Sequence, residues 1–177
     1  MAITPPEYPW QGITMDFVTD LPESTACKYD SILVVVNRLT KMALYIPCRK
    51  DLDSPELARL FFERVICHYG VPEHIITDRG PTFTSLFWKH ICTHMTIDHQ
   101  LSTSFHPQMN GQIERQNQTM EQYPCAYVNY EQNNWVDLLP LAQFVYNNTV
   151  HATTRISPFY AMYGMHPRMH LTPFVTS

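Results

Sequence analysis

The stretch SILVVVN, residues 31–37, decides the fold class, because five of its seven residues are aliphatic and they follow one another without a polar break. A continuous β-branched run of this length predicts a strand that is buried on both faces. Strands of this kind occur in sheets that helices cover. The stretch therefore predicts an α/β domain.

Four more strands are predicted around this one. Residues 10–18, WQGITMDFV, alternate with a period of two and have one strongly apolar face. Residues 41–48 predict a third strand, residues 71–78 a fourth that ends at Asp78, and residues 97–102 a fifth. The expected fold is α/β with a five-stranded mixed sheet flanked by helices, and its first three strands are expected to be antiparallel.

The helices are predicted from caps and periodicity. A helix is expected over residues 55–68, with Ser54 as its N-cap and Gly70 after its end. Further helices are expected at 84–95, 112–123, 134–150 and 157–164, the last with Ser157 as cap and Gly164 as stop. The expected core-facing residues are Leu57, Leu60, Phe61, Val65 and His68 in the first helix, and Phe87, Ile91 and Met95 in the second.

Composition limits the class of protein. The 177 residues are 45% hydrophobic and 16% charged, the balance of one globular domain. The chain has no apolar run long enough to span a membrane and no signal-peptide pattern, so we expect an intracellular protein that is neither secreted nor membrane-bound. The net charge of −4 argues against nucleic-acid binding through bulk positive charge alone.

Three acids stand out by position: Asp16 inside the first strand, Asp78 at the end of the fourth, and Glu114 early in the helix that follows the loop 102–111. Carboxylates at the ends of neighbouring strands can converge with one from a facing helix, because such strands lie only about 5 Å apart. Hard oxygen ligands of this kind select Mg²⁺ or Mn²⁺. Two such ions roughly 3.5–4 Å apart catalyse phosphoryl transfer.

Each acid also has an ordinary structural explanation. An Asp before Arg-Gly is a common turn residue, and a Glu in the first turns of a helix is favoured by the helix dipole. Asp16 is harder to explain in this way, although a neighbouring backbone group can satisfy an acid inside a strand. Composition and spacing leave both interpretations open.

A resemblance favours the metal site. Asp78 and Glu114 are separated by 35 residues, as in the D,D-35-E signature. The segments DSILVVVNRLTKMALYIPC, ITDRGPTFTSLFWK, LSTSFHPQMNGQIERQNQTMEQY and NNWVDLLPLAQFVYNNTVHATTRISPFYAMYG flank or contain these acids. Together they resemble the integrase catalytic core of gypsy-class (metavirus-type) long-terminal-repeat retrotransposons, within the retroviral integrase superfamily.

The resemblance implies a ribonuclease-H-like fold and a DNA integrase with Asp16, Asp78 and Glu114 as catalytic residues and metal ligands. The expected cofactors are two Mg²⁺ or Mn²⁺ ions per active site when DNA is bound. The expected reactions are 3′-end processing and strand transfer of element DNA into target DNA. The expected partners are double-stranded DNA and a second copy of the chain in a homodimer or higher oligomer, and the expected location is the nucleus.

The resemblance also implies DNA contacts. In similar integrases the loop before the glutamate and the helix that bears it contact the element's DNA end. The corresponding residues here are Phe105, His106, Gln108, Asn110, Gln112, Asn117, Gln118 and Glu121. Their alternative is an ordinary solvated polar face. Pro81 falls where similar proteins touch target DNA, and Arg79 and Arg115, the cations nearest to the acids, either orient phosphate or pair with the carboxylates.

Several positions depart from the family pattern. Asn37 stands where relatives usually have Asp, Met109 where they have Thr, and Thr96 where they have Gly. Pro124 replaces a usual Leu, and a proline inside a helix costs roughly 3 kcal/mol, so we expect a kink or a break near residue 123.

The expected domain organisation is an N-terminal extension at 1–9, the catalytic core at 10–167 and a tail or truncated linker at 168–177, without the family's zinc-binding and C-terminal modules. Two other functions remain open. One is a domesticated, non-catalytic module that binds DNA or protein, and the other is a ribonuclease-H-like nuclease with Asp20 or Asp98 as a fourth acid.

Overall fold

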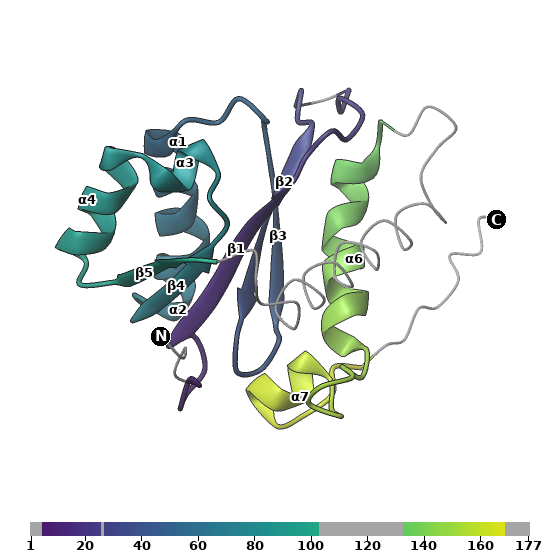
Figure 1. Ribbon diagram of the computed structural model, residues 1–177. Coiled ribbons are helices and arrows are strands. Elements are labelled where there is room, and N and C mark those ends of the chain that lie inside the picture. The colour runs from purple at the N-terminus through teal and green to yellow at the C-terminus, as the bar shows by residue number, and fades with distance from the viewer. Residues whose placement is uncertain (1–4, 26, 103–132, 169–177) are drawn as a thin grey trace.

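The computed structural model describes residues 5–25, 27–102 and 133–168 of the chain. Within these ranges five strands form one sheet in the order β3-β2-β1-β4-β5 (Figure 1). The strands are β1 (Gly12–Val18), β2 (Ser31–Asn37), β3 (Ala43–Cys48), β4 (His74–Thr77) and β5 (Asp98–Leu101). β1, β2 and β3 are antiparallel, whereas β4 and β5 run parallel to β1. The predicted five-stranded mixed sheet is confirmed.

Strand β2 is buried along its whole length, as its sequence predicts. Its alternate residues supply two separate hydrophobic clusters, because neighbouring side chains of a strand point to opposite faces. Leu33 and Val35 belong to one cluster, and Ile32, Val34 and Val36 belong to the other. The sheet is therefore covered on both faces.

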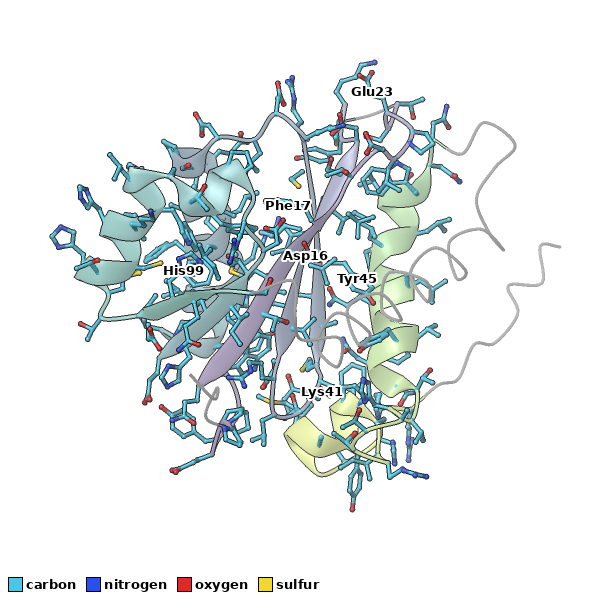
Figure 2. The ribbon with its side chains drawn as sticks, viewed as in Figure 1. Asp16, Phe17, Glu23, Lys41, Tyr45 and His99 are labelled. Atoms are coloured by element: carbon cyan, nitrogen blue, oxygen red, sulfur yellow. The ribbon has the colours of Figure 1, made fainter. Side chains whose placement is uncertain are left out.

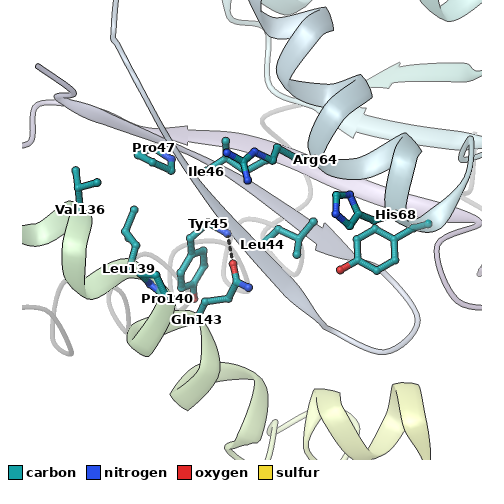
Figure 3. A pocket seen from close by; sticks show the side chains of 11 residues that line it. Leu44, Tyr45, Ile46, Pro47, Arg64, His68, Val136, Leu139, Pro140 and Gln143 are labelled. Carbon is teal, nitrogen blue, oxygen red and sulfur yellow. Dashed lines mark hydrogen bonds between the residues drawn. The ribbon is translucent and has the colours of Figure 1, made fainter. Parts of the chain in front are cut away.

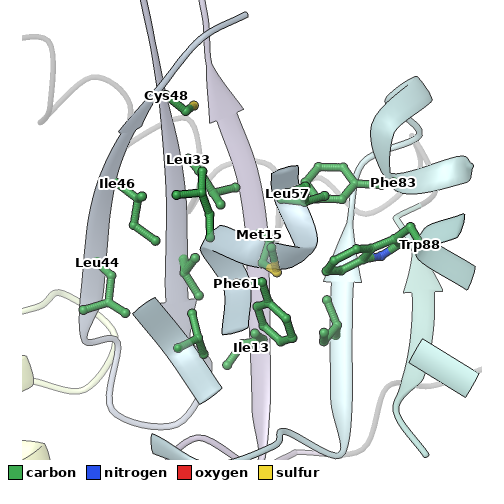
Figure 4. Close-up of a cluster of buried hydrophobic side chains, with 14 of the residues drawn as sticks. Ile13, Met15, Leu33, Leu44, Ile46, Cys48, Leu57, Phe61, Phe83 and Trp88 are labelled. Carbon is green, nitrogen blue, oxygen red and sulfur yellow. The ribbon is translucent and has the colours of Figure 1, made fainter. Parts of the chain in front are cut away.

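One face is covered by the helices that lie between β3 and β5 in the sequence. These are α1 (Ser54–Phe61), a π-helical segment η1 (Phe62–Ile66), α2 (Cys67–Tyr69), α3 (Pro81–Thr84) and α4 (Leu86–His94). Their side chains meet those of the sheet around Leu57, Phe61 and Trp88 (Figure 4). Phe61 and Trp88 form an edge-to-face pair with ring centroids 5.5 Å apart. This cluster fixes the first helical layer on the sheet.

The first helix differs from its prediction at both ends. Its N-cap is Asp53, whose side chain accepts a hydrogen bond from the Glu56 N–H, and Ser54 is the first helical residue. The predicted cap Ser54 is therefore wrong by one residue, and Asp is as strong an N-cap as Ser. At the other end the chain passes through the π-helical segment η1 before α2. A π-helical turn contains one residue more than an α-helical turn, so the side chains after it point away from the face that a continuous α-helix would bury. His68 is therefore exposed and outside the predicted core stripe.

The second predicted helix, 84–95, is observed as α4 (Leu86–His94), but the prediction of its buried face is wrong. Ser85 caps α4 by accepting a hydrogen bond from the Trp88 N–H, so the residues before it form the separate short helix α3. Trp88 and Cys92 are buried in α4, one residue away from the predicted stripe of Phe87, Ile91 and Met95. Phe87 is exposed, and the other two are only partly buried. The larger Trp88 takes the core position because it removes more apolar surface from water.

The other face of the sheet is covered by α6 (Trp135–Asn148), with α7 (Pro158–Tyr163) beside it (Figure 1). The predicted cap of α7 is confirmed, because the Ser157 Oγ accepts a hydrogen bond from the Tyr160 N–H, and Gly164 ends the helix in the left-handed conformation. Trp135 anchors the start of α6, since its indole N–H donates to the Pro22 carbonyl at 2.7 Å.

Helix α6 also closes the outer edge of the sheet at β3. The Ala43 N–H donates to Asn147 Oδ1 at 2.8 Å, Asn147 Nδ2 donates to the Ala43 carbonyl at 2.9 Å, and the Tyr45 N–H donates to Gln143 Oε1 at 2.8 Å. Gln143 and Asn147 are four residues apart, a rise of about 6 Å along a helix, and Ala43 and Tyr45 are two residues apart, about 6.8 Å along a strand. The two side-chain amides of α6 therefore lie opposite alternate residues of β3. The next such position is Pro47, which has no N–H. The edge donors of β3 are thereby satisfied.

The turn between α4 and β5 contains Thr96, which has φ of 57°. The Thr96 N–H donates to the Thr93 carbonyl at 3.1 Å and the Ile97 N–H to the Cys92 carbonyl at 2.8 Å, the two bonds of a Schellman motif. The left-handed position of this motif favours glycine, and a β-branched residue there is strained. Thr96, one of the positions that departs from the pattern of similar integrases, thus occupies a site where glycine fits best.

Candidate active site

Asp16 lies in β1, and Asp78 directly follows β4, at positions that correspond in the parallel pairing of the two strands. Met15 of β1 is paired with Thr77 of β4, so the residue that follows each of them is one of the two acids. Adjacent strands are about 4.8 Å apart. The two acids are therefore near each other, and the charge of Asp78 acts on Asp16; their convergence on a metal ion stays a prediction. Figure 2 shows Asp16 near the centre of the sheet.

The surroundings of Asp16 disfavour its charge. Burial is the main cause that raises the pKa of its carboxyl group, from an ordinary 3.8 to about 6. The Phe17 N–H donates to Asp16 Oδ1 at 2.9 Å and lowers the pKa, whereas the nearby charge of Asp78 raises it. Asp16 is therefore a partly buried acid with a like charge beside it, and among the described residues the Phe17 N–H is the one donor that lowers its pKa.

Asp78 is exposed and held by the turn that follows it. The Gly80 N–H donates to Asp78 Oδ1 at 3.1 Å, an Asx-type turn that fixes one carboxylate oxygen. A Cβ at position 80 would lie 3.1 Å from Asp78 Oδ1 and 3.4 Å from Asp78 Oδ2. The DRG sequence predicts a turn, but the sequence alone gave no sign that the glycine leaves room for the carboxylate.

The segment after Asp78 is tied to the first helical layer. Pro81 is exposed at the first position of α3. The Ser54 Oγ of α1 lies 3.1 Å from the Thr82 carbonyl and 2.7 Å from the Ser85 Oγ. Through these contacts the start of α1 supports the segment that begins next to Asp78.

Arg79 is exposed. Among the residues that the structure describes, it forms no ion pair with either acid, and neither acid has a cationic partner within 4 Å. Of the two roles predicted for Arg79, pairing with the carboxylates is therefore not observed. The orientation of phosphate stays a prediction.

The third predicted ligand, Glu114, lies outside the described residues. The same holds for most of the predicted DNA contacts and for two departures from the family pattern, namely Phe105, His106, Gln108, Met109, Asn110, Gln112, Arg115, Asn117, Gln118, Glu121 and Pro124. Of the predicted site residues, the structure therefore places Asp16, Asp78, Arg79 and Pro81. The predicted break near residue 123 stays untested.

The two acids suit a hard divalent cation. Both offer carboxylate oxygens, which Mg²⁺ and Mn²⁺ prefer, and a cation between them would remove the like-charge repulsion that raises the Asp16 pKa. Within the described residues, no group of three or more His, Cys, Asp or Glu side chains is arranged to hold a metal ion.

The two candidates for a fourth acid do not join the pair. Asp98 is opposite His74 at the start of β5, and its carboxylate lies 3.3 Å from His74 Nδ1. Asp78 follows Thr77 at the other end of the neighbouring strand. Asp20 is exposed beyond the end of β1 and is paired with Lys50. A nuclease site with either acid is not supported by these positions.

A hollow of about 340 Å³ lies elsewhere, between β3, the helices η1 and α2, and α6 (Figure 3). Its lining includes Leu44 and Tyr45 of β3, His68 of α2, and Leu139 and Gln143 of α6. None of the described residues that line it is acidic. It is separate from the candidate active site.

Comparison with solved structures identifies the class of fold. The HTLV-2 integrase catalytic core domain in complex with magnesium matches with a TM-score of 0.68 and 21% identity, over 89% of this chain and 99% of that one. A chain of the simian T-cell lymphotropic virus intasome matches with 0.72 and 21% over 99% and 63%. The BIV integrase catalytic core matches with 0.63 and 20% over 85% and 91%. The fold is that of the ribonuclease-H-like integrase catalytic core.

Sequence comparison gives the relationship. The Tf2-3 and Tf2-4 transposon polyproteins of Schizosaccharomyces pombe are each 39% identical to the chain over 167 residues, which are 94% of this chain and 12% of each polyprotein. The chain is related to the polyproteins of these Ty3/gypsy retrotransposons and has the fold of a retroviral-type integrase catalytic core. It spans about an eighth of their length. No model of a known protein family matches it. None of the described helices has the length and apolar character needed to cross a membrane.

Proposed function

We propose that the chain is a catalytically competent integrase core that carries out divalent-metal-dependent phosphoryl transfer on DNA. The single observation that carries the proposal is the placement of Asp16 in β1 and of Asp78 directly after β4, at positions that correspond in the parallel pairing of the two strands. The 39% identity to transposon polyproteins supports the choice of DNA as substrate. The chemistry would be 3′-end processing followed by strand transfer.

Asp16, Asp78 and Glu114 would hold the metal, with Mg²⁺ or Mn²⁺ as the cation. When bound, two such ions activate the attacking oxygen and stabilise the leaving oxygen of a phosphodiester. The HTLV-2 core that shares the fold is described in complex with magnesium. The chain itself supplies the positions of the carboxylates. The Phe17 N–H holds one oxygen of Asp16, and the Gly80 N–H holds one oxygen of Asp78.

Both proposed reactions displace one oxygen at phosphorus. In end processing, water attacks a phosphodiester near the 3′ end of the element, and the bond to the departing 3′ oxygen breaks and leaves a new 3′-hydroxyl group. In strand transfer, that hydroxyl attacks a phosphodiester of the target, and the displaced 3′ oxygen takes up a proton. Arg79, which is exposed next to Asp78, would orient a phosphate, and Pro81 would touch target DNA.

The remaining DNA contacts rest on the family resemblance. They are Phe105, His106, Gln108, Asn110, Gln112, Arg115, Asn117, Gln118 and Glu121. The partners we propose are element and target DNA and at least one further copy of the chain. Relatives of this fold are described in an intasome and in dimeric and trimeric forms. We expect the full protein to act in the nucleus.

The proposal is tested with a branched disintegration substrate and Mn²⁺. The chain should cleave and rejoin this DNA, whereas Asp78→Asn and Glu114→Gln should be inactive. Asp20→Asn is a matched control, because Asp20 follows the same strand as Asp16 but pairs with Lys50, and it should remain active.

Two outcomes would replace the proposal. If the chain binds DNA but shows no activity, a non-catalytic binding module is favoured. If it hydrolyses an RNA–DNA hybrid and leaves the branched DNA intact, a ribonuclease-H-like nuclease is favoured.

A further inference from the structure

Two successive hydrogen bonds connect His99 of β5, through the Thr77 hydroxyl, to the backbone carbonyl of Asp78. The Thr77 Oγ1 donates to the Asp78 carbonyl at 2.9 Å. The same oxygen lies 2.9 Å from His99 Nε2. Thr77 is the last residue of β4, and His99 is in the neighbouring strand β5, 22 positions later in the sequence. No local sequence pattern points to this contact, because the residues are brought together only by the parallel pairing of the strands.

The donor and the acceptor in each of these two hydrogen bonds follow from the number of protons on the threonine hydroxyl. A threonine hydroxyl has one proton and can donate only once. Since that proton is directed to the Asp78 carbonyl, the contact with the histidine requires the Nε2–H to donate to the Thr77 oxygen. His99 Nε2–H therefore donates to Thr77 Oγ1, and the Thr77 hydroxyl donates to the Asp78 carbonyl.

The surroundings hold both side chains in place. Only 2% of Thr77 is exposed, so its hydroxyl has little access to water as an alternative partner. The ring of Trp88 packs edge-to-face against His99, with centroids 6.3 Å apart and planes at 88°. Trp88 itself is fully buried in the core cluster. The imidazole is thus fixed by the core of the domain and not by the surface.

The bonded carbonyl belongs to the peptide that begins the Asx-type turn. Because the Thr77 hydroxyl holds the Asp78 carbonyl on one side and the Gly80 N–H holds the carboxylate on the other, both ends of the Asp78 residue are fixed. Loss of an outer-shell partner of a metal ligand typically weakens metal binding roughly 10–100-fold; here the partner bonds the backbone of Asp78 and acts on its carboxylate through the conformation of that residue.

We propose that Thr77 and His99 are positioning residues that orient Asp78 for the divalent cation of the active site. Neither residue touches the reacting atoms. The proposal rests on the proposed function for the identity of the site. It adds two residues to the site that neither the spacing of the acids nor the family resemblance identified.

The experiment compares matched variants of the whole chain. Thr77→Val removes the hydroxyl at nearly constant volume, and Thr77→Ser keeps it. His99→Leu removes the donor, and His99→Gln keeps an N–H near the position of Nε2. For each variant, Mn²⁺ affinity is measured by calorimetry on the DNA-free protein, and melting in EDTA checks that it is folded. The Mn²⁺ dependence of disintegration is then measured.

Thr77→Val and His99→Leu are expected to weaken Mn²⁺ binding roughly tenfold or more and to raise the Mn²⁺ concentration that gives half-maximal activity to the same extent. Thr77→Ser and His99→Gln are expected to restore at least most of the affinity. A purely structural role would lower the melting temperature of folded variants and leave their Mn²⁺ affinity unchanged, and this result would overturn the proposal. So would a loss that neither Thr77→Ser nor His99→Gln restores.

Failure of the proposed function gives a different result. If the unaltered chain binds Mn²⁺ but does not act on the branched DNA, the integrase proposal fails, while the affinities of the four variants still decide the role of Thr77 and His99. If the chain binds no Mn²⁺ at all, both proposals fail.

Discussion

Replacement of Asp16 by Asn is expected to stabilise the metal-free protein while it removes a proposed metal ligand. The substitution keeps the shape of the side chain and an oxygen that can accept the Phe17 N–H. It removes the negative charge that burial and Asp78 disfavour. A gain in stability from the loss of a functional group is the expected sign of a site whose charge is unfavourable without its ligand.

The size of the gain follows from the pKa of Asp16. Its rise from 3.8 to about 6 corresponds, at about 1.4 kcal/mol per pKa unit, to an upper limit of about 3 kcal/mol. Asp16 is only partly buried, so solvent reduces this figure, and we expect about 1–2 kcal/mol at pH 8. For a domain of this size that gain raises the melting temperature by roughly 2–8 °C.

The gain depends on pH in a defined direction. The folded-state pKa of Asp16 is raised above the unfolded value, so the contribution of this group to stability is fully present below pH 3.8 and is lost as the pH rises through about 6. Asp16→Asn does not undergo this loss. The difference between the two proteins should therefore be small at pH 4 and largest above pH 7.

Thermal and urea unfolding in EDTA, at several pH values from 4 to 8, measure this difference. Asp78→Asn is the control, because Asp78 is exposed and its replacement should change stability by at most about 0.5 kcal/mol. Addition of Mg²⁺ at ten times its dissociation constant should stabilise the unaltered chain by about 1.4 kcal/mol and leave Asp16→Asn unchanged. If Asp16→Asn is no more stable than the unaltered chain at pH 8 in EDTA, the reasoning is wrong.

Three further substitutions test other parts of the structure. Thr96→Gly relieves a left-handed β-branched residue and should raise the free energy of unfolding by about 0.5–1 kcal/mol, measured by urea unfolding; a loss of stability would show that the turn is not strained. Asn147→Ala leaves the buried N–H and carbonyl of Ala43 without partners and should lower the same quantity by about 2–4 kcal/mol; a loss below about 1 kcal/mol would mean that α6 does not seal the edge of β3. Gly80→Ala puts a Cβ 3.1 Å from Asp78 Oδ1 and should reduce the disintegration rate roughly tenfold with little change in melting temperature; full activity would show that the glycine is not needed to place the carboxylate.

The features that the sequence predicts well are those with a local physical cause. The buried run of β2 and the caps of α7 are confirmed because aliphatic content and cap residues act within a few positions. The proximity of Asp16 and Asp78 was also predictable, since both were expected at neighbouring strands of one sheet. Parallel pairing of β1 with β4 then brings them to the same level.

The errors arise where tertiary packing decides between similar local alternatives. In α4 the stripe that begins at Phe87 and the stripe that begins at Trp88 are both apolar at helical spacing, and only the shape of the core selects the second. In the first helix the π-helical segment shifts the face, so His68 is exposed. The contact between Thr77 and His99 was not predictable, because it depends on the register of β4 and β5.

The residues that stabilise the domain are different from the residue whose charge is unfavourable at the proposed site. The sheet is covered on both faces, and its β3 edge is bonded to Asn147 and Gln143. In contrast, burial and the charge of Asp78 disfavour the charged form of Asp16. A binding module without catalysis would be more stable with Asn at this position, and no backbone contact would be lost. A divalent cation bound at this site would offset both causes of the raised pKa, because it would replace the lost hydration of the carboxylate and counter the charge of Asp78. The unfavourable charge of Asp16 is therefore the feature of the metal-free domain that a bound cation would relieve.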